Sequence, residues 1–448
     1  MNSWAPEIKK RHGVLAKKIK TGCVVAVGNR EVIRNHDVVF PFRQNSHFLY
    51  LTGIGEPGYA FMYDLDEDVF TLFVPEIDAK HIVWVGDVTS ADELKERAGA
   101  QHVYGMGQFE KKVKARLKSK KPLYFLKTEH PTHAYGKERK DTLPRMAVLH
   151  TALSEMRFEK SHFELQRMKK AALISSKAHR VAMQTSKAGV KEYQLQSYLE
   201  QVFMEQGGRQ PAYGSIVASG KNAAILHYTQ NQRTLMPDDF LCIDAACEVE
   251  GYAADITRTY PVSGKFSSLQ KDLYQVVLDV QKKAIEGLKP GIWFRTLHEE
   301  AAVGLLEGLM GLGYLKGNAT SMKEAGLDRL FFPHGLGHSL GLDVHDCAPV
   351  PKTKKSKKIR SNVLLQENCV VTIEPGIYFI PALINDPKYR KKFKTEVNWS
   401  KVENLFSVGG IRIEDDIQVT AHKPMNLTAD CPKEIADLEN IIGKRSFK

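Results

Sequence analysis

Five residues of types that bind divalent metals recur in the C-terminal half of this 448-residue chain, each inside its own apolar or glycine-rich motif. They are Asp244, Asp255, His338, Glu374 and Glu414. Four carboxylates and one imidazole are more ligands than one catalytic zinc uses, and they suit a pair of divalent ions held mainly by oxygen. Such a pair can lower the pKa of a shared water and make it a nucleophile near neutral pH. A fold that uses these residues must bring five distant segments together.

The remaining composition is that of an ordinary globular protein, long enough for two or three domains. No run of about 18 apolar residues predicts a membrane span, and the lysine-rich first twenty residues lack the apolar stretch of a signal peptide. The six cysteines show no Cys-x-x-Cys spacing, which favours reduced residues in a cytoplasmic protein. The net charge of +12 permits weak attraction to nucleic acid, but no nucleic-acid-binding motif accompanies the basic runs at 352–360 and 388–394. We therefore expect solvated loops there.

Two domains are predicted, a mixed α/β domain over residues 1–155 and a larger catalytic domain over residues 156–448, in an α+β protein. The first domain has no glycine-rich phosphate loop. Its clearest predicted strands and helices are Cys23–Val27, Ala60–Tyr63, Thr71–Pro75, Ala91–Ala98 and Phe109–Leu117. In the second domain we predict helices at Ser161–Ser186, Lys191–Gln206, Leu269–Leu288 and Thr296–Leu312, and strands at Val370–Ile373 and Gly410–Ile417.

A hairpin is predicted from Phe240–Asp244 and Tyr252–Asp255, which flank a turn at Glu250-Gly251. A centre between residues 249 and 250 would place Asp244 directly opposite Asp255, so that both side chains project to one face. Two carboxylates that point together are unfavourable without a bound cation. A hairpin with two solvated aspartates is the competing interpretation, but the apolar neighbours indicate buried strands, where an unpaired carboxylate is costly.

Histidines and glutamates complete the pattern. His334, His338 and His345 fall within twelve positions, and the glycines between the first two argue against a helical His-Glu-x-x-His zinc motif. Glu374 follows an apolar run and precedes Pro375-Gly376, which predicts a turn. In 409–414, strand alternation places Arg412 and Glu414 on one face, where the arginine could orient a ligand carboxylate. His227 also follows an apolar run, and a buried core histidine is its competing interpretation.

Together these motifs resemble the aminopeptidase P and prolidase family, whose catalytic domain has the pita-bread fold. The segments 42–53 and 81–86, the second with Trp84, resemble that family's N-terminal domain. The resemblance implies two divalent cations, most often Mn²⁺, with Co²⁺, Zn²⁺ and Fe²⁺ as alternatives. It also implies a homodimer or homotetramer that acts on proline-containing peptides, with neither membrane nor nucleic acid as a partner.

The same resemblance assigns a role to each residue. Asp255 and Glu414 would bridge both metals, Asp244 would complete one metal, and His338 and Glu374 would complete the other. Glu374 would also transfer the proton as general base and acid, and the hydroxide between the metals would attack the peptide carbonyl. The remaining assignments are substrate and oxyanion contacts by His345 and His227, and supporting positions for His334, Arg412 and Tyr378.

The two subgroups of the family differ in the peptides they cleave. Segments 227–229, 255–262 and 428–434 resemble aminopeptidase P, whereas 333–338, the long stretch 378–409 and Arg360 resemble prolidase. Arg360 would bind the carboxylate of a dipeptide and so disfavour longer peptides. The more numerous matches favour an Xaa-Pro aminopeptidase, with an Xaa-Pro dipeptidase as the alternative. A metal-free binding module and a creatinase-like enzyme are disfavoured by the intact ligand set, and a methionine aminopeptidase by the large N-terminal domain.

Overall fold

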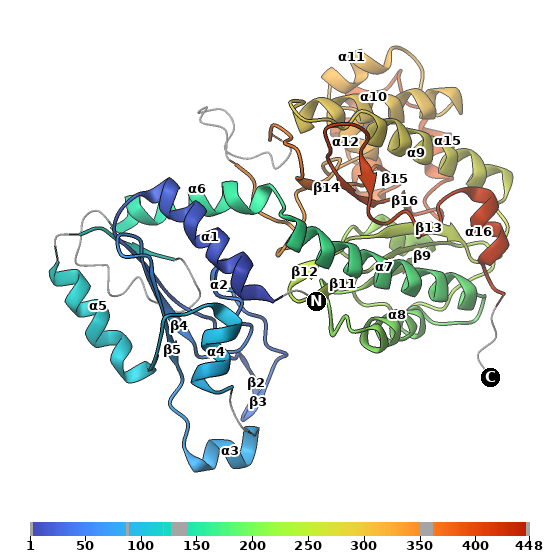
Figure 1. Cartoon of the computed structure of the whole chain (residues 1–448). Coiled ribbons are helices and arrows are strands. Elements are labelled where there is room, and N and C mark those ends of the chain that lie inside the picture. Colours follow the sequence, from blue (N-terminus) through green and yellow to red (C-terminus); the bar gives the residue numbers. More distant parts are fainter. Residues whose placement is uncertain (1–2, 87–88, 120, 127–141, 350–361, 445–448) are drawn as a thin grey trace. The chain divides into compact units, whose positions relative to one another are not determined.

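The computed structural model describes residues 3–86, 89–119, 121–126, 142–349 and 362–444 (Figure 1). The chain divides into two compact units, Met1–Arg157 and Phe158–Lys448. Each unit combines helices with strands, so the predicted α+β class is confirmed. Within the described residues, no helix combines the length and the apolar character that a membrane crossing requires.

The first unit is built around a five-stranded sheet of order β6-β5-β4-β1-β7. Its elements are α1 (Trp4–Ile19), β1 (Cys23–Val27), β2 (Ile33–Asn35), β3 (Val38–Val39), α2 (Ser46–Thr52), β4 (Ala60–Asp64), β5 (Val69–Val74), α3 (Ala79–Val85), α4 (Ala91–Ala98), β6 (His102–Gly105), η1 (Met106–Gln108), α5 (Phe109–Lys118), β7 (Leu123–Phe125) and α6 (Thr142–Phe158). Both faces of the sheet are covered. Met62 of β4 packs in one cluster with Phe109 of α5, and Phe61 on the opposite face lies 5.5 Å, centroid to centroid, from Phe48 of α2.

The second unit arranges its strands in several short sheets, with orders β13-β10-β9, β12-β11-β8, β14-β17-β18 and β15-β16. Its elements are α7 (His162–Thr185), α8 (Glu192–Gln206), β8 (Gln210–Pro211), β9 (Ile216–Ser219), η3 (Gly220–Ala224), β10 (Phe240–Asp244), β11 (Cys247–Val249), β12 (Tyr252–Ala253), β13 (Thr257–Pro261), α9 (Ser268–Glu286), α10 (Phe294–Gly311), α11 (Ala319–Glu324), α12 (Asp328–Phe331), β14 (Val370–Ile373), β15 (Gly376–Tyr378), α13 (Pro381–Ile384), α14 (Pro387–Lys392), α15 (Trp399–Glu403), β16 (Gly410–Arg412), β17 (Asp415–Gln418), β18 (Met425–Asn426) and α16 (Ile435–Ile441).

Two pairs of helices enclose these strands. Helices α7 and α8 pack against β9 and β11, and α9 and α10 pack on the side of β14 and β16 (Figure 1). Local sequence determines where the helices begin and end. Ser161 and Ser267 form capping boxes with Glu164 and Gln270 at the starts of α7 and α9, and Gly207 ends α8 with a φ of 91°. The four helices predicted here are confirmed to within two residues at each end.

The predicted register of the hairpin at Glu250-Gly251 is wrong. Both turn residues have positive φ, which gives a two-residue loop with Val249 paired to Tyr252, and β10 continues the same register by pairing Asp244 with Thr257. Asp255 therefore does not face Asp244 across a ladder but lies in the irregular segment between β12 and β13. The positive φ of both loop residues places the centre of the turn one residue closer to the C-terminus than predicted, so the partner of Asp244 moves by two residues, from Asp255 to Thr257.

The predicted single strand Gly410–Ile417 is also wrong, because the structure has two strands there, β16 and β17, in different sheets. The break falls at Ile413 and Glu414, whose backbone N–H groups donate to the carbonyl oxygens of Pro375 and Thr257. The backbone thus changes partners at Glu414, and this change of partner brings the glutamate beside the segment that carries Asp255.

Candidate metal centre

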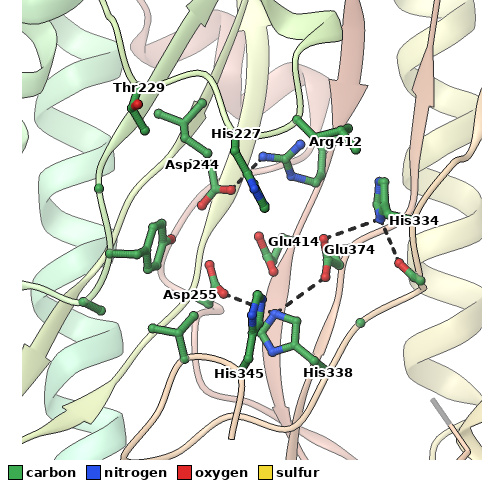
Figure 2. Close-up of a pocket in the computed structure, with 18 residues that line it drawn as sticks. His227, Thr229, Asp244, Asp255, His334, His338, His345, Glu374, Arg412 and Glu414 are labelled. Atoms are coloured by element: carbon green, nitrogen blue, oxygen red, sulfur yellow. Dashed lines mark hydrogen bonds and ion pairs between the residues drawn. The ribbon is translucent and has the colours of Figure 1, made fainter. Parts of the chain in front are cut away.

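A cavity of about 900 Å³ opens in the second unit and collects most of the residues predicted to be functional (Figure 2). Each of the four acidic residues on the cavity wall lies at the end of a strand or just outside one. Asp244 ends β10, Asp255 precedes β13, Glu374 follows β14, and Glu414 separates β16 from β17. Its walls are formed by Ala212, Tyr213, Gly214, Ile216, Leu226, His227, Thr229, Asp244, Asp255, His334, Gly335, Gly337, His338, Val344, His345, Glu374, Arg412 and Glu414.

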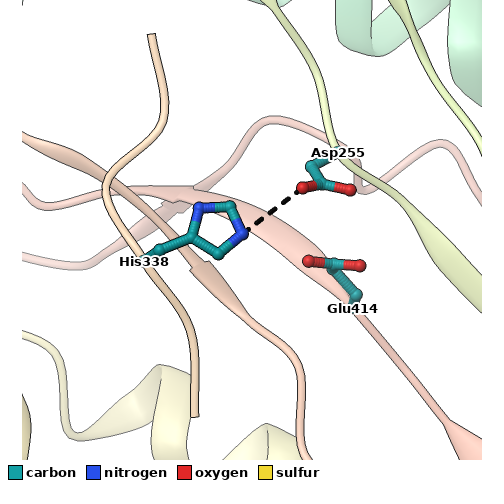
Figure 3. A group of neighbouring side chains, drawn as sticks. All are labelled: Asp255, His338 and Glu414. Carbon is teal, nitrogen blue, oxygen red and sulfur yellow. Dashed lines mark ion pairs between the residues drawn. The ribbon is translucent and has the colours of Figure 1, made fainter. Parts of the chain in front are cut away.

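The centre of this group is formed by Asp255, His338 and Glu414 (Figure 3). All three side chains are buried, and one potential ligand atom of each lies within 4.8 Å of the others. The Nε2 atom of His338 is 3.4 Å from Asp255 Oδ2. Two carboxylates and an imidazole at this spacing form a donor set for a divalent cation.

Glu374 lies beside this centre, with Oε1 3.6 Å from His338 Nε2 and Oε2 3.7 Å from His334 Nδ1 (Figure 2). Its backbone N–H donates to the carbonyl oxygen of Leu336, and the hydroxyl of Thr372, two residues earlier in β14, accepts a hydrogen bond from the His338 N–H. Strand β14 and the glycine-rich segment that carries both histidines therefore hold one another in place.

Asp244 completes the acidic wall and is paired with Arg412. The Nη2 atom of Arg412 donates to Asp244 Oδ2 at 2.7 Å, whereas the buried Oδ1 has no hydrogen-bond partner among the described residues. Arg412 also donates to the hydroxyl groups of Thr257 and Tyr378. The arginine thus fixes the orientation of one carboxylate oxygen and leaves the other available to a ligand.

The tautomer of His338 is determined by its neighbour. Its Nδ1 atom lies 3.1 Å from the carbonyl oxygen of Ser339, which can only accept a hydrogen bond. Nδ1 is therefore the protonated nitrogen of the neutral ring, and Nε2 presents a lone pair toward Asp255 and Glu374. This is the state in which an imidazole binds a metal.

The acidic cluster is electrostatically costly without a cation. Burial, with repulsion from neighbouring carboxylates, raises the pKa of Asp255 and raises that of Glu414 well above its usual value. Burial also raises the pKa of Glu374 to about 7, although His338 and Arg412 oppose the shift. Burial would lower the pKa of His338, but Asp255 and Glu374 raise it overall. Buried acids with raised pKa values in one cavity mark a functional site that a cation would stabilise.

The other predicted histidines lie around this centre. His345 packs edge-on against His338, with ring centroids 4.3 Å apart, and His227 reaches the cavity from the turn after η3 (Figure 2). The His334 ring is only slightly exposed, and burial lowers its pKa to about 3; its Nε2 lies 2.8 Å from the Tyr378 hydroxyl. Tyr378 is fully buried behind the wall. Arg360 lies outside the described residues, so its predicted role stays a prediction.

Residues 166–421, more than half of the chain, match the model of metallopeptidase family M24, and residues 8–124 match the aminopeptidase P N-terminal domain. The chain belongs to metallopeptidase family M24. The predicted resemblance is thereby confirmed.

Relatives of this M24 metallopeptidase match it over nearly its full length. The Xaa-Pro aminopeptidase of Haemophilus influenzae is 35% identical over 445 residues, which are 97% of this chain and 96% of that protein. The probable Xaa-Pro aminopeptidase pepP of Pyrenophora tritici-repentis is 34% identical over 94% of this chain and 92% of that protein. Two solved structures each match 97% of this chain with 97% of their own. Zn-substituted E. coli aminopeptidase P in complex with product has a TM-score of 0.84 and 31% sequence identity. Pseudomonas aeruginosa aminopeptidase PepP has a TM-score of 0.85 and 30% sequence identity.

Several supporting residues of the M24 site were missed by sequence reasoning. The Thr257 hydroxyl donates to Glu414 Oε2 at 2.6 Å, and the Asp416 carboxylate accepts from the Asp255 backbone N–H at 3.0 Å. Tyr213 lines the cavity, and burial together with Asp244 and Asp255 raises the pKa of its hydroxyl well above its usual value. Thr257 and Asp416 stand two positions from predicted ligands, and this spacing was the only local signal for either.

A buried charge network supports the same segment from behind. Asp415 accepts from Arg258 at 2.7 Å and from Lys433 at 2.6 Å, and Arg258 also donates to the Glu414 carbonyl oxygen. Burial would raise the pKa of Asp415, but the two cations hold it well below its usual range. The network fixes the backbone on which Glu414 stands.

Another supporting residue, Glu192, forms hydrogen bonds on both sides of the turn that carries His227. It is the first residue of α8 and is fully buried. Its carboxylate accepts hydrogen bonds from the backbone N–H groups of Ser219 and Arg233 and from the side chains of Ser219, Asn222 and Tyr228. These donors lie on both sides of His227 in the chain, so one carboxylate closes the loop at both ends.

Proposed function

We propose that this chain is a metal-dependent Xaa-Pro aminopeptidase, which releases the N-terminal residue from peptides with proline in the second position. The observation that carries the proposal is the cluster of Asp255, His338 and Glu414, with Asp244 and Glu374 beside it, inside a cavity large enough for a short peptide. Membership in family M24 supports hydrolysis as the reaction, and the aminopeptidase P N-terminal domain favours this substrate class over a prolidase.

Two divalent cations fit the donor set. The five residues supply mainly carboxylate oxygen, and the buried Asp244 Oδ1 has no hydrogen-bond partner among the described residues. We propose that Asp255 and Glu414 contact both ions, Asp244 one ion, and His338 and Glu374 the other. Cations held there would supply Lewis acidity toward the scissile carbonyl and a lowered pKa of the attacking water. Mn²⁺ is the ion we expect, with Co²⁺, Zn²⁺ and Fe²⁺ as alternatives.

Glu374 is the residue that we propose for proton transfer. Its carboxylate lies at the edge of the cluster, partly exposed to the cavity, and two histidines flank it at 3.6 and 3.7 Å. From this position it can accept the proton of the attacking water and then deliver it to the proline nitrogen as the peptide bond breaks. His334, which lies beside Glu374, hydrogen-bonds the Tyr378 hydroxyl, and that hydroxyl accepts a hydrogen bond from Arg412. A chain of contacts therefore links Glu374 to Arg412.

His227 and His345 lie on the cavity wall and are not part of the cluster of Asp255, His338 and Glu414, although His345 packs against His338. We propose that they donate hydrogen bonds to the peptide carbonyl oxygen, where negative charge develops in the transition state. An Xaa-Pro bond has no N–H and its proline has a fixed φ, so recognition has to rely on the shape of the ring. The apolar side chains of Leu226 and Val344 on the wall can pack against that ring.

The single experiment that tests this function compares hydrolysis of Ala-Pro-Ala, Ala-Pro and Ala-Ala-Ala, with Mn²⁺ and after chelation. Metal-dependent cleavage of both proline peptides and not of Ala-Ala-Ala is the expected result. Cleavage of Ala-Pro alone would instead establish a dipeptidase and support the predicted role of Arg360. Absence of metal binding would favour a binding module of the same fold.

Location and assembly complete the proposal. All six cysteines are in the thiol form, and five of them are buried. Cysteine thiols suit a reducing compartment, which supports the cytoplasm as the location. A homodimer or homotetramer stays a prediction from the family resemblance, and gel filtration with light scattering tests it.

A further inference from the structure

A second cavity, of about 650 Å³, adjoins the metal centre. Its walls come from helices α10, α11 and α12 and from the segment Pro333–Gly335 (Figure 1). His334 and Gly335 line both cavities, so the two spaces meet at the edge of the candidate active site. None of the residues predicted from the sequence to be functional lies in this second cavity except His334.

Asp328 is the unusual residue in its wall. It is the first residue of α12 and only 8% exposed, and its Oδ1 atom is shut off from solvent without a hydrogen-bond partner. Within the described parts of the chain, no basic side chain forms an ion pair with it. Of the three basic residues on the wall, Arg295 and Lys323 are paired with Glu299, at 2.8 and 3.5 Å, and Arg329 is exposed.

A buried carboxylate without a partner is costly, and a cation in the cavity would offset that cost. A metal ion does not suit this place. His298 Nδ1 accepts a hydrogen bond from the Leu336 N–H, and burial lowers the pKa of its ring, so its other nitrogen carries a proton and cannot bind a metal. Asp328 would then be the only buried anionic ligand, which is too few for a divalent cation. The ammonium or guanidinium group of a side chain needs only one carboxylate.

The position of the second cavity indicates which molecule would carry the ammonium or guanidinium group that pairs with Asp328. A peptide bound in the first cavity can reach the second one past His334 and Gly335, which line both. We propose that the second cavity receives the segment of the substrate downstream of the proline, and that Asp328 selects a lysine or arginine side chain in that segment. This inference rests on the proposed aminopeptidase function and specifies its substrates.

Two pairs of peptides test the proposal: Ala-Pro-Lys-Ala against Ala-Pro-Nle-Ala, and Ala-Pro-Ala-Lys against Ala-Pro-Ala-Nle. Norleucine matches the lysine stem without its charge. For at least one pair, kcat/KM of the wild-type enzyme should favour lysine by about two- to fivefold, the effect of one partly screened ion pair. The preference should lie mainly in KM and should decrease as salt is raised, because the cavity is open to solvent.

Asp328→Asn should abolish the preference while Ala-Pro-Ala is cleaved at the wild-type rate. Glu324→Gln is the matched control, because it removes the same charge from an exposed position on the same wall and should keep most of the preference. The asparagine variant removes an unpaired buried charge, so it should fold with an unchanged or higher Tm. If this variant does not fold, the comparison of lysine with norleucine peptides in the wild type still tests whether the enzyme prefers a cationic side chain.

Cleavage of all four peptides without a preference for lysine would overturn the proposal and leave the aminopeptidase function standing. A preference that persists in Asp328→Asn, or one lost equally in Glu324→Gln, would also overturn the role of Asp328. Failure of the metal-loaded enzyme to cleave any proline peptide would overturn both this inference and the proposed function.

Discussion

The Thr257 hydroxyl donates a 2.6 Å hydrogen bond to Glu414 Oε2 and accepts one from Arg412 Nε at 3.0 Å. A neutral side chain therefore connects a predicted bridging ligand to the only arginine on the wall of the described cavity. Because Glu414 stands where β16 and β17 separate, no ladder hydrogen bond of its own strand orients it. The orientation of its carboxylate depends on contacts from another segment of the chain.

Thr257→Val should therefore weaken metal binding by about 10- to 100-fold, the usual cost of losing a residue that orients a ligand. Valine keeps the shape but leaves a buried oxygen of Glu414 and the Arg412 Nε without their partner. Metal affinity is measured by titration of the chelated protein followed by activity. Thr257→Ser, which keeps the hydroxyl, is the control, and an equal loss in both variants would contradict the role of the hydrogen bond.

Glu374→Gln should reduce kcat by about 10²- to 10⁴-fold, because the amide cannot accept and return a proton. The change conserves shape, and glutamine oxygen can still contact a cation, so the fold and most of the metal content should persist. Steady-state kinetics on Ala-Pro-Ala, with circular dichroism on the same samples, provides the measurement. Wild-type turnover in this variant would exclude Glu374 from proton transfer.

Asp255→Asn and Asp244→Asn should differ in the number of metal ions that they retain. The first removes a proposed bridging ligand and should empty both positions, whereas the second removes a ligand to one ion and should leave about one per chain. Metal content by mass spectrometry after dialysis distinguishes the two. Equal stoichiometry in both variants would count against the bridging role of Asp255.

The contrast between these aspartates shows what the sequence could predict. Asp244 and Asp255 were predicted to be metal ligands partly from their apolar neighbours, and both line the cavity, although the predicted register that paired them was wrong. Glu374 was recognisable because it follows an apolar run and precedes Pro375-Gly376, a pair of residues that predicts a turn. Local patterns of this kind also predicted the helices, since capping serines and terminal glycines act over a few residues. Glu192 and Asp328 carry no such local signal, because their roles depend on contacts with distant segments or on the absence of a partner.

The stability of the metal-free protein should fall as pH rises from about 4.5 to about 7. Burial raises the pKa of Glu374 from 4.5 to about 7 in the folded state. Between these two values the folded chain binds more protons than the unfolded chain, so the free energy of unfolding decreases as pH rises. The loss due to this residue is on the order of 1–3 kcal/mol.

Urea unfolding in the presence of a chelator measures this loss, with Glu374→Gln as the control that lacks the titrating group. The difference in stability between wild type and variant should grow with pH, to the disadvantage of the wild type. Added Mn²⁺ should reverse the trend, because a cation favours the ionised carboxylates. A difference between the two proteins that stays constant with pH would refute the assignment.

Glu192→Gln should impair catalysis although Glu192 does not line the cavity. Its carboxylate is an acceptor only, and its donors include two backbone N–H groups on either side of His227. Glutamine replaces one acceptor oxygen with an NH₂ group, so either the Ser219 or the Arg233 contact becomes a clash between two donors. The turn should then open, and we expect kcat/KM for Ala-Pro-Ala to decrease by about tenfold or more, the cost of leaving a buried donor unsatisfied.

A double-mutant cycle with His227→Ala separates this positioning role from a general loss of stability. If Glu192 acts through His227, the glutamine substitution should add little once the histidine is absent, and the coupling should approach the effect of the single change. Independent effects that simply add would show that Glu192 stabilises the domain without orienting the histidine. Glu200→Gln, a partly buried residue of the same helix that accepts from Ser215 and Gln196, serves as the matched control and should leave kcat/KM unchanged.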